Sequence, residues 1–196
     1  MINSEIKTCA WAMNQPLERE YHDKEWGIVN RDDNYLFEFL TLEGAQAGLS
    51  WYTILKRRDA YRLAFDNYDL VRLAGHDDER VEEIIKNFDV IKHRGKISSV
   101  FSNAKAALAL QEEYGSLATA LWQFVEHRPV NNEWQEMSQI PVSTPESKAM
   151  SKFLKKKGFK FVGETICYAF MQAVGMVNDH LTDCPCYSKS VASQAE

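Results

Sequence analysis

Apolar residues recur along most of this chain at the three- and four-residue spacing of α-helices, whereas the two-residue alternation of a half-buried strand is scarce. The spacing is clearest from Tyr35 to Leu42, directly after Asp32 and Asp33, whose side chains are good helix caps. Gly48 is a natural end for this segment, because glycine readily adopts the left-handed conformation that closes many helices. The sequence therefore predicts an all-α fold.

Similar patterns predict further helices, each with a recognisable start or end. Ser50 can cap a helix that begins at Trp51. Asp77, or the aspartate after it, can open a short helix. A longer helix is expected over 93–114 and would close at a glycine, with another helix following to about residue 125.

Near the carboxyl end, two more helices are expected around a short turn. Ser143 and Glu146 have the spacing of a capping box, with a proline in the first turn, and Gly158 is the natural end of the helix that they begin. After a short connector, apolar periodicity resumes and ends at Gly175. This predicts a helix, a tight hairpin over 158–164 and a second helix.

The length and composition are those of one globular domain. A chain of 196 residues can bury a substantial core, and 45% hydrophobic with 26% charged residues is ordinary for a folded protein. No apolar run approaches the roughly 18 residues of a membrane helix, and the start of the chain lacks the order of a secretory signal. We expect one cytoplasmic domain over 1–196, with a helical core at about 32–175 and terminal segments at about 1–31 and 176–190.

The charge is unevenly distributed along the chain. The net value of −5 does not by itself suggest a nucleic-acid partner. Residues 91–105 and 143–170 each carry +4, however, which leaves −13 on the remainder. Basic segments of this kind attract phosphates, although they can equally be solvated helix faces.

Glu43 is an unusual residue for its place in the first predicted helix. At about 100° per residue its side chain projects near the middle of the apolar face, with Gln46 beside it. Burying a carboxylate is costly unless it is paired or hydrogen-bonded. Glu43 is therefore a partnered core glutamate, a residue turned outward at the end of the helix, or a functional carboxylate in an apolar pocket.

Aromatic residues are concentrated near the amino end of the chain, at Trp11, Tyr21, Trp26, Tyr35, Phe37, Phe39, Trp51 and Tyr52. Most such residues simply fill a core. Stacked rings are nevertheless what a pocket for a flat base requires, and a positively charged methylated purine would gain a cation–π attraction.

Two cysteines and two histidines near the ends of the chain form a candidate metal site: Cys9, His22, His180 and Cys184. Two thiolates and two imidazoles suit a closed, tetrahedral zinc site that stabilises a fold and leaves no open position for catalysis. The grouping could also be accidental, and Cys186 competes with Cys184. In a cytosolic protein, free thiols or metal ligands are expected rather than disulfides.

The predicted hairpin is rich in lysine, with the sequence Lys155-Lys-Lys-Gly-Phe-Lys-Phe-Val-Gly163. Backbone N–H groups at the start of the following helix, with the helix dipole behind them, can hold a DNA phosphate without reading base sequence. The alternative is a lysine-rich surface turn without a ligand.

Five segments, taken in order, carry a more specific signal: Tyr21-His-Asp-Lys-Glu-Trp-Gly27, Leu42-Glu-Gly-Ala-Gln-Ala-Gly-Leu-Ser-Trp51, His93-Arg-Gly-Lys-Ile97, Gly158-Phe-Lys-Phe-Val-Gly-Glu-Thr-Ile-Cys-Tyr168, and Asn178-Asp-His180 with Cys184. Together they resemble the type I 3-methyladenine DNA glycosylases of the helix-hairpin-helix superfamily, from Cys9 to about Tyr187. The resemblance implies an all-α glycosylase domain in which Zn²⁺, held by the four candidate ligands, joins the N- and C-terminal segments.

The same resemblance implies roles for individual side chains. Glu43 would accept hydrogen bonds from a base flipped out of the duplex, Tyr21 would help to read that base, and Trp51 would stack on it. The other pocket residues would be Trp11, Trp26 and Gln46. The residues that would contact DNA are Leu49, as an apolar plug in the duplex, and Lys160, Val162 and Gly163 of the hairpin.

Three positions depart from the family pattern or limit what it implies. Glu18 stands where relatives often have an aromatic pocket residue, which changes one wall of the pocket. Phe161 replaces the first glycine of the general hairpin pattern. The family lacks the catalytic aspartate of its superfamily, so Asp179 is given no catalytic role although it follows the expected hairpin helix.

The implied activity is hydrolytic excision of 3-methyladenine, with 3-methylguanine as a further candidate, from alkylated double-stranded DNA. A monofunctional, monomeric enzyme of base-excision repair would leave an abasic site. The cationic base is a good leaving group, so Glu43 would bind its edge and stabilise the developing cationic sugar.

Three rival functions remain at this point. A lesion-binding module would not cut the base from the sugar, whereas a bifunctional glycosylase with lyase activity would use Lys160 or a neighbour as a Schiff-base nucleophile. A zinc hydrolase would need an open metal position, which four protein ligands do not leave.

Overall fold

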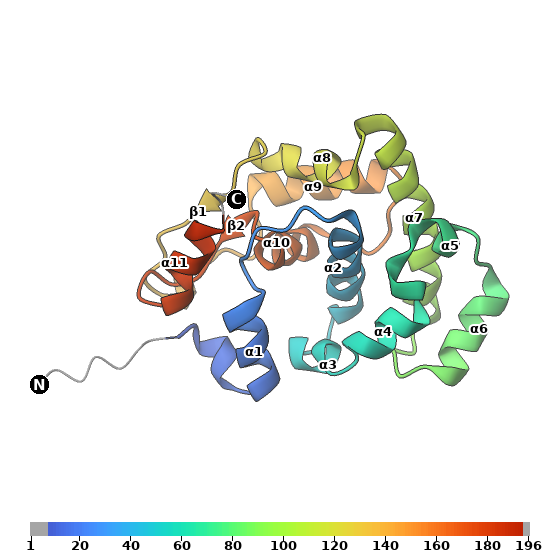
Figure 1. Ribbon diagram of the computed structural model, residues 1–196, viewed down its shortest axis with the longest axis horizontal. Coiled ribbons are helices and arrows are strands. Elements are labelled where there is room, and N and C mark those ends of the chain that lie inside the picture. The colour runs from blue at the N-terminus through green and yellow to red at the C-terminus, as the bar shows by residue number, and fades with distance from the viewer. Residues whose placement is uncertain (1–7, 194–196) are drawn as a thin grey trace, which may run out of the picture.

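The computed structural model describes residues 8–193 and is built almost entirely of helices (Figure 1). The α-helices are α1 (Pro16–Lys24), α2 (Asp33–Gln46), α3 (Trp51–Leu55), α4 (Arg58–Ala64), α5 (Leu70–Ala74), α6 (Asp78–Asn87), α7 (Arg94–Tyr114), α8 (Leu117–Trp122), α9 (Pro145–Lys156), α10 (Glu164–Ala173) and α11 (Pro185–Ala192). The all-α prediction is confirmed. The parts of the expected domain at 1–7 and 194–196 lie outside the described residues.

Short 3₁₀ turns and one pair of strands complete the described structure. The turns are η1 (Ala10–Met13), η2 (Asp66–Tyr68), η3 (Gln123–Val125) and η4 (Met137–Gln139). The strands β1 (Val130–Asn131) and β2 (Val177–Asn178) pair in parallel, with Val130 opposite Val177. Each strand has two residues, too few for an alternating pattern to mark it in the sequence. No helix in the described part of the chain is long and apolar enough to cross a membrane.

Helix α2 is the central element of the molecule. The Asp32 carboxylate accepts a hydrogen bond from the Tyr35 N–H at 2.8 Å, so the predicted cap is formed. Every residue from Leu36 to Ala45 is buried. Neighbours include α3, α7, α8 and α10 (Figure 1). Because α2 is enclosed on nearly all sides, a polar side chain on it must either find a partner or line a cavity.

The other predicted helix boundaries in the first part of the chain have physical causes that the structure shows. The Ser50 side chain accepts from the Thr53 N–H, and the Asp77 side chain caps α6. The His93 ring accepts from the Lys96 N–H at the start of α7. Gly115, with a φ of 86°, closes α7 in the left-handed conformation.

The hairpin between α9 and α10 forms as predicted, with a cap one residue later than expected. The Thr144 hydroxyl and Ser147 make the reciprocal capping box of α9, whereas Ser143 donates to Glu164 instead. Ser143 and Thr144 are both residue types that cap helices. The contact of Ser143 with α10 leaves Thr144 as the cap of α9. Gly158, with a φ of 94°, follows the end of α9. Helices α9 and α10 then pack against each other.

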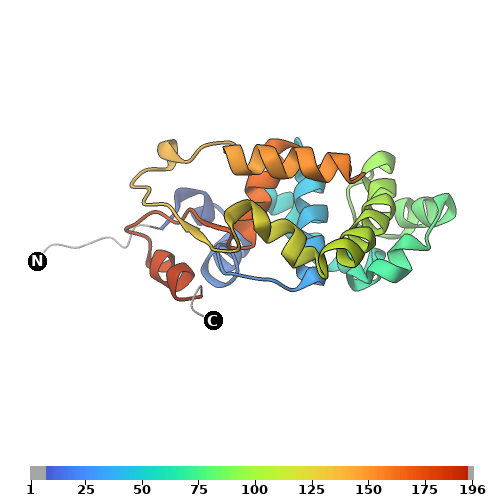
Figure 2. The same ribbon diagram turned by 90° about the horizontal axis from the view of Figure 1, so that it is seen from above.

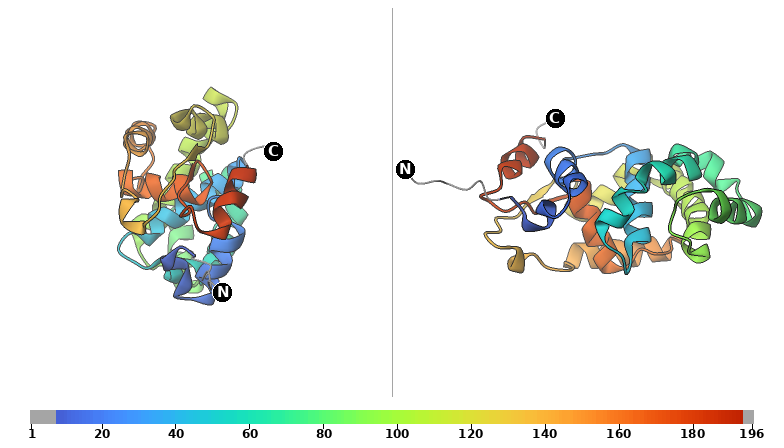
Figure 3. Two further views of the ribbon diagram at one scale, coloured as in Figure 1. Left: turned by 90° about the vertical axis from the view of Figure 1, so that its left-hand side faces the viewer. Right: turned by 90° about the horizontal axis from the view of Figure 1, so that it is seen from below.

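The first and last described segments pack together at one end of an elongated molecule, where α1 (blue) lies beside α11 (red) (Figures 2 and 3). The Ser190 hydroxyl donates to the Gly27 carbonyl at 2.6 Å. Gly175 lies close to the segment that follows α1. A Cβ on this residue would come within 2.5 Å of the Val29 nitrogen. Glycine is required there by both this approach and a φ of 74°.

Candidate active site and metal centre

A cavity of about 310 Å³ opens among η1, α1, α2, α3 and α10. The residues that line it are Trp11, Asn14, Glu18, Tyr21, Trp26, Glu43, Gln46, Trp51, Met137, Ile140, Ala169 and Gln172. All six side chains expected in a base pocket are among them. Asn14, Met137, Ile140, Ala169 and Gln172 were not expected, since no pattern in the sequence marks them.

Glu43 is the chemically unusual residue of this cavity. Its side chain is buried, with 6% of the residue exposed. Within the described part of the chain it makes no hydrogen bond or ion pair, which removes the alternative of a partnered core glutamate. Desolvation by burial raises the pKa of Glu43 to about 8. A carboxyl group of this kind is ready to accept hydrogen bonds from a ligand.

Two further side chains in the cavity wall have unused hydrogen-bond donors. The hydroxyl of Tyr21 and the indole N–H of Trp51 are buried and have no partner within the described structure. Such groups are costly to bury, typically by about 1–3 kcal/mol each. The ring centres of Tyr21 and Trp51 lie 5.4 Å apart. Burial, together with the nearby Glu43 charge, raises the pKa of Tyr21, so the phenol stays a neutral donor.

Trp11 and Trp26 join this cavity to the candidate metal site. Their ring centres lie 5.1 Å apart, and Trp11 also contacts Tyr21. Trp26 packs edge-on against the His180 ring at 4.6 Å, and its carbonyl oxygen lies 2.9 Å from His180 Nε2. The walls of the cavity therefore depend on the packing around the histidines.

The predicted ligand set of Cys9, His22, His180 and Cys184 comes together as one buried cluster that could hold a metal ion. His180 Nδ1 lies 3.1 Å from His22 Nε2, 3.9 Å from Cys9 Sγ and 3.8 Å from Cys184 Sγ. Cys184 Sγ is 3.6 Å from His22 Nε2. A tetrahedral zinc ion, with bonds of about 2.0–2.3 Å, sets ligand separations of roughly 3.3–3.8 Å. The donor atoms thus fit a closed four-ligand site.

The groups around this cluster favour metal binding. His22 Nδ1 lies 2.8 Å from an Asp23 carboxylate oxygen, and the outer nitrogen of His180 faces the Trp26 carbonyl. Hydrogen bonds from Cys9 and the two histidines hold the pKa of Cys184 well below its ordinary value. Cys186 contacts Asp23 instead and lies outside the four-ligand set. All four cysteines are free thiols, as expected.

Asp179 is occupied by the protein itself. One oxygen accepts from Asn132 at 2.7 Å and Trp134 at 2.8 Å, and the other accepts from Tyr168 at 2.6 Å and Gln172 at 2.8 Å. Four donors saturate a buried carboxylate. This geometry agrees with assigning Asp179 no catalytic role and makes it an anchor for β2.

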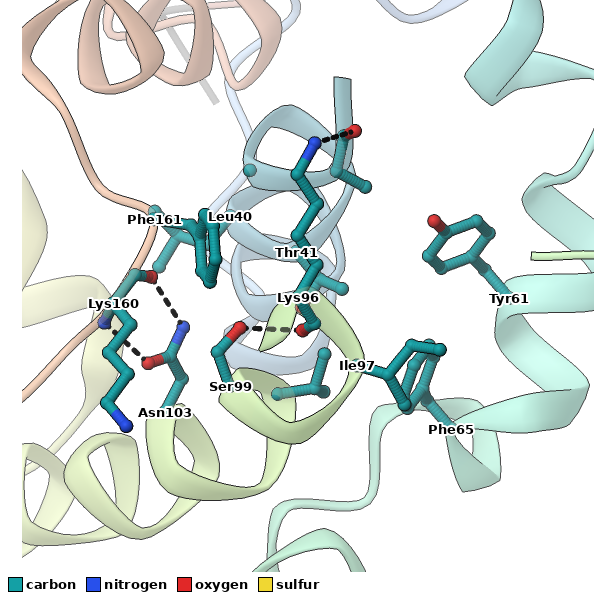
Figure 4. A pocket seen from close by; sticks show the side chains of 13 residues that line it. Leu40, Thr41, Tyr61, Phe65, Lys96, Ile97, Ser99, Asn103, Lys160 and Phe161 are labelled. Carbon is teal, nitrogen blue, oxygen red and sulfur yellow. Dashed lines mark hydrogen bonds between the residues drawn. The ribbon is translucent and has the colours of Figure 1, made fainter. Parts of the chain in front are cut away.

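The hairpin is held rigidly against α7. The Asn103 side chain accepts from the Lys160 N–H at 2.8 Å and donates to the Lys160 carbonyl at 3.0 Å (Figure 4). Phe161 adopts a φ of 57° and packs near Gly44 of α2. The Val162 side chain is buried, so only its backbone can face a ligand. Gly163 stands at the start of α10 without a side-chain cap.

Leu49 lies on the turn that follows α2 and is 40% exposed. The Lys96 ammonium donates to the carbonyls of Ala45 and Ala47, at 2.9 and 3.1 Å, and thereby fixes the end of α2 before that turn. The space between Lys96 and the hairpin is only about 20 Å³, far too small for a base. The base cavity is separate from this small space. The last turn of α2 contributes to the wall of the base cavity and leads directly into the turn that carries Leu49.

An all-helical chain with a hairpin held on its core, an aromatic cavity and a buried acid matches a known family of base-excising proteins. The family model described as methyladenine glycosylase matches residues 11–187, and the chain belongs to this family. The DNA-3-methyladenine glycosylase 1 of Escherichia coli K12 is 47% identical over 182 residues, with 93% of this chain and 97% of the relative covered. The DNA-3-methyladenine glycosylase of Haemophilus influenzae is 46% identical, with 91% and 96% covered.

Solved structures give the same result. A crystal structure of a 3-methyladenine DNA glycosylase I superposes with a TM-score of 0.88 at 49% identity, covering 92% of this chain and 99% of the other. The 3-methyladenine DNA glycosylase I of Staphylococcus aureus, solved to explain 3-methyladenine recognition, superposes with a TM-score of 0.89 at 31% identity, covering 97% and 98%.

Proposed function

We propose that this protein is a monofunctional DNA glycosylase that flips 3-methyladenine out of alkylated double-stranded DNA and hydrolyses its bond to the sugar, as a step of base-excision repair. The observation that carries the proposal is Glu43, a buried carboxyl that has no partner among the described residues and lies in a cavity that also contains two unused donors. The similarity to 3-methyladenine DNA glycosylases supports the same substrate.

The chemistry follows from the charge of the base. An adenine methylated at N3 carries a positive charge while attached to the sugar, so Glu43 can pair with it in its ionised form. Rings of the cavity wall stack on the base, and Tyr21 and Trp51 offer hydrogen bonds to its acceptors. A damaged base also costs less to unstack than an intact one.

Hydrolysis then needs little acid catalysis. The glycosidic C–N bond breaks, its electron pair stays with the base, and the base leaves as a neutral molecule. Water attacks the anomeric carbon and loses a proton, which leaves a hydroxyl on an abasic sugar. Glu43 acts by stabilising the developing cationic sugar electrostatically.

Contacts with the duplex come from two separate elements. Leu49, on the exposed turn after α2, fills the gap that the flipped base leaves. The backbone N–H groups of Val162 and Gly163, at the start of α10, hold a phosphate together with the side chain of Lys160. The enzyme acts as a monomer in the cytoplasm, with 1–196 as a single helix-hairpin-helix glycosylase domain.

A structural Zn²⁺ completes the fold in this proposal. Cys9, His22, His180 and Cys184 hold it, and bound zinc contributes folding energy by joining the two ends of the chain. Four protein ligands leave no position for a metal-bound water, which disfavours zinc hydrolysis. The contacts proposed for 3-methyladenine in the base cavity also suit 3-methylguanine, which is a second cationic substrate.

The position of Lys160 favours a monofunctional enzyme. Its backbone is clamped by Asn103 on α7, and Lys160 is not among the residues that line the base cavity. A Schiff-base nucleophile would have to reach the sugar of the flipped base.

Chromatography of the products from methylated duplex DNA separates the rival functions. Free 3-methyladenine with intact abasic strands supports the proposal, whereas a persistent DNA complex without free base indicates a binding module. Strand cleavage, with a covalent complex trapped by borohydride, indicates lyase activity.

A further inference from the structure

The base cavity contains a second buried carboxylate, Glu18, which enters from a different wall. Glu18 lies on α1, while Glu43 lies on α2. From this arrangement we infer that Glu18 is a selectivity residue that makes the cavity prefer purines with a fixed positive charge over neutral purines. The inference rests on the proposed function and names the charge class of its substrate.

Glu18 differs from the charged residues next to it in what it contacts. Arg19 pairs with Asp23 at 2.6 Å, and Glu20 pairs with Lys24 at 2.7 Å on the outer face of α1. Glu18 is only 9% exposed, lines the cavity, and makes no hydrogen bond or ion pair within the described residues. It lies one turn from Tyr21, on the same face of the helix.

No positive charge in the cavity wall balances the two acids. The described residues that line it include no lysine, arginine or histidine. Arg58 on α4, whose charge acts on Tyr21 in the cavity wall, is taken by Glu25 and Glu38 at 2.8 Å each. An empty cavity therefore holds two carboxyl groups without a counter-charge, and a cationic ligand relieves both at once.

The hydrogen-bonding chemistry of carboxylates adds to this preference. An ionised carboxylate only accepts hydrogen bonds, so Glu18 and Glu43 favour a ligand with amine hydrogens and a delocalised positive charge. A neutral purine can satisfy one acid through its amine but leaves the second acid without a partner. Such a mismatch rejects wrong ligands more strongly than shape does.

A binding experiment tests the inference without catalysis. The probes are 3,9-dimethyladeninium, a permanent cation in which a methyl group replaces the sugar, and neutral 9-methyladenine. Their affinities are followed by the fluorescence of the cavity tryptophans. We expect Glu18→Gln to weaken binding of the cation by about tenfold and to leave the affinity for 9-methyladenine unchanged. Glu18→Asp, which keeps the charge, should retain most of the preference.

The matched control is Glu20→Gln, which removes the same charge from the outer face of α1 and should change neither affinity. Equal weakening of both ligands by Glu18→Gln, or an unchanged ratio in a folded variant, would overturn the inference. If Glu18→Gln does not fold, Glu18→Asp tests the inference instead. This variant keeps the charge, so loss of the preference for the cationic ligand in it would contradict a charge effect.

Base release from methylated DNA, measured on the same preparations, separates this inference from the proposed function. Release of 3-methyladenine by the natural protein together with an unchanged ligand ratio in Glu18→Gln refutes the role of Glu18 alone. No release by the natural protein refutes the proposed function.

Discussion

Glu43 lies in a cavity whose described walls offer it no hydrogen bond, so its charge depends on what enters. Burial raises its pKa to about 8, whereas a cationic base would favour the ionised form. From the sequence, helical periodicity placed Glu43 on an apolar face, but periodicity does not distinguish a partnered core acid from an unpartnered one. That distinction needed the positions of α1, α3 and α10 around it.

The free enzyme must lose the Glu43 proton before the carboxylate can pair with the cation. We therefore expect kcat/KM for 3-methyladenine excision to rise with pH and to level off above about 8. Glu43→Gln should show no such rise. Single-turnover excision measured across this range checks the prediction, and a flat profile for the natural enzyme would contradict it.

Burial of Glu43 also makes the free energy of unfolding depend on pH. Because the folded protein holds the Glu43 proton more tightly than the unfolded chain, the contribution of this group to the free energy of unfolding falls as pH rises from about 4.5 to about 8. Glu43→Gln has no such proton to lose. The free energy of unfolding of the variant minus that of the natural protein should therefore be larger at pH 9 than at pH 5, by at most about 5 kcal/mol.

Urea unfolding without DNA at these two pH values measures the effect. Water in the open cavity should keep the gain below this limit. An equal difference between variant and natural protein at both pH values would show that Glu43 is not strongly desolvated.

At the scale of helices, the basic segment 91–105 shows what a charge count misses. Lys92 donates to the carbonyls of Ile85 and Phe88, Arg94 pairs with Glu82, and Lys96 fixes the end of α2. A sequence shows how many charges a segment carries, but it does not show which charged side chains are already paired with other groups of the same protein. We therefore place the phosphate contacts on the hairpin rather than on this segment.

Lys96 is a positioning residue for the turn that carries Leu49. Lys96→Met should lower the free energy of unfolding by about 1 kcal/mol and reduce excision by about tenfold, because the carbonyls at the end of α2 lose a charged donor. Lys105→Met, a matched loss of charge from an exposed position on the same helix, should change stability by less than about 0.5 kcal/mol. Equal effects of the two substitutions would show that only net charge matters.

Side-chain caps made several helix starts predictable, although α5, which Asp69 caps, was not predicted. Asp32, Ser50 and Asp77 are local signals that the structure retains. The short helices α1, α4, α5 and α11 were not predicted, since five to nine residues give little periodicity. The cap at Thr144 instead of Ser143 depended on a tertiary contact.

For the whole molecule, the main long-range feature is the packing of the first described segments against the last. The Cys9, His22, His180 and Cys184 cluster brings together residues that are far apart in sequence, with Cys9 and His180 separated by 171 positions and Cys184 further still. The resemblance predicted the set, while spacing alone left Cys186 as a competitor of Cys184. Trp26 then connects this cluster to the base cavity.

Removal of the proposed zinc should therefore affect stability and excision together. We expect a strong chelator to lower Tm by roughly 10 °C or more and to reduce base release. Cys184→Ser should lose the metal, measured by mass spectrometry, whereas Cys186→Ser should retain one ion per chain. A metal-free protein with unchanged Tm would contradict a structural role for zinc.

The central claim is that an unpartnered, buried carboxyl in an aromatic cavity drives excision of a cationic base. Its most direct test is the amount of 3-methyladenine released from methylated duplex DNA by Glu43→Gln and by the natural protein, with DNA affinity measured in parallel. We expect release to fall by at least about a hundredfold while the affinity for DNA changes little. Equal release by a folded Glu43→Gln variant would contradict the account.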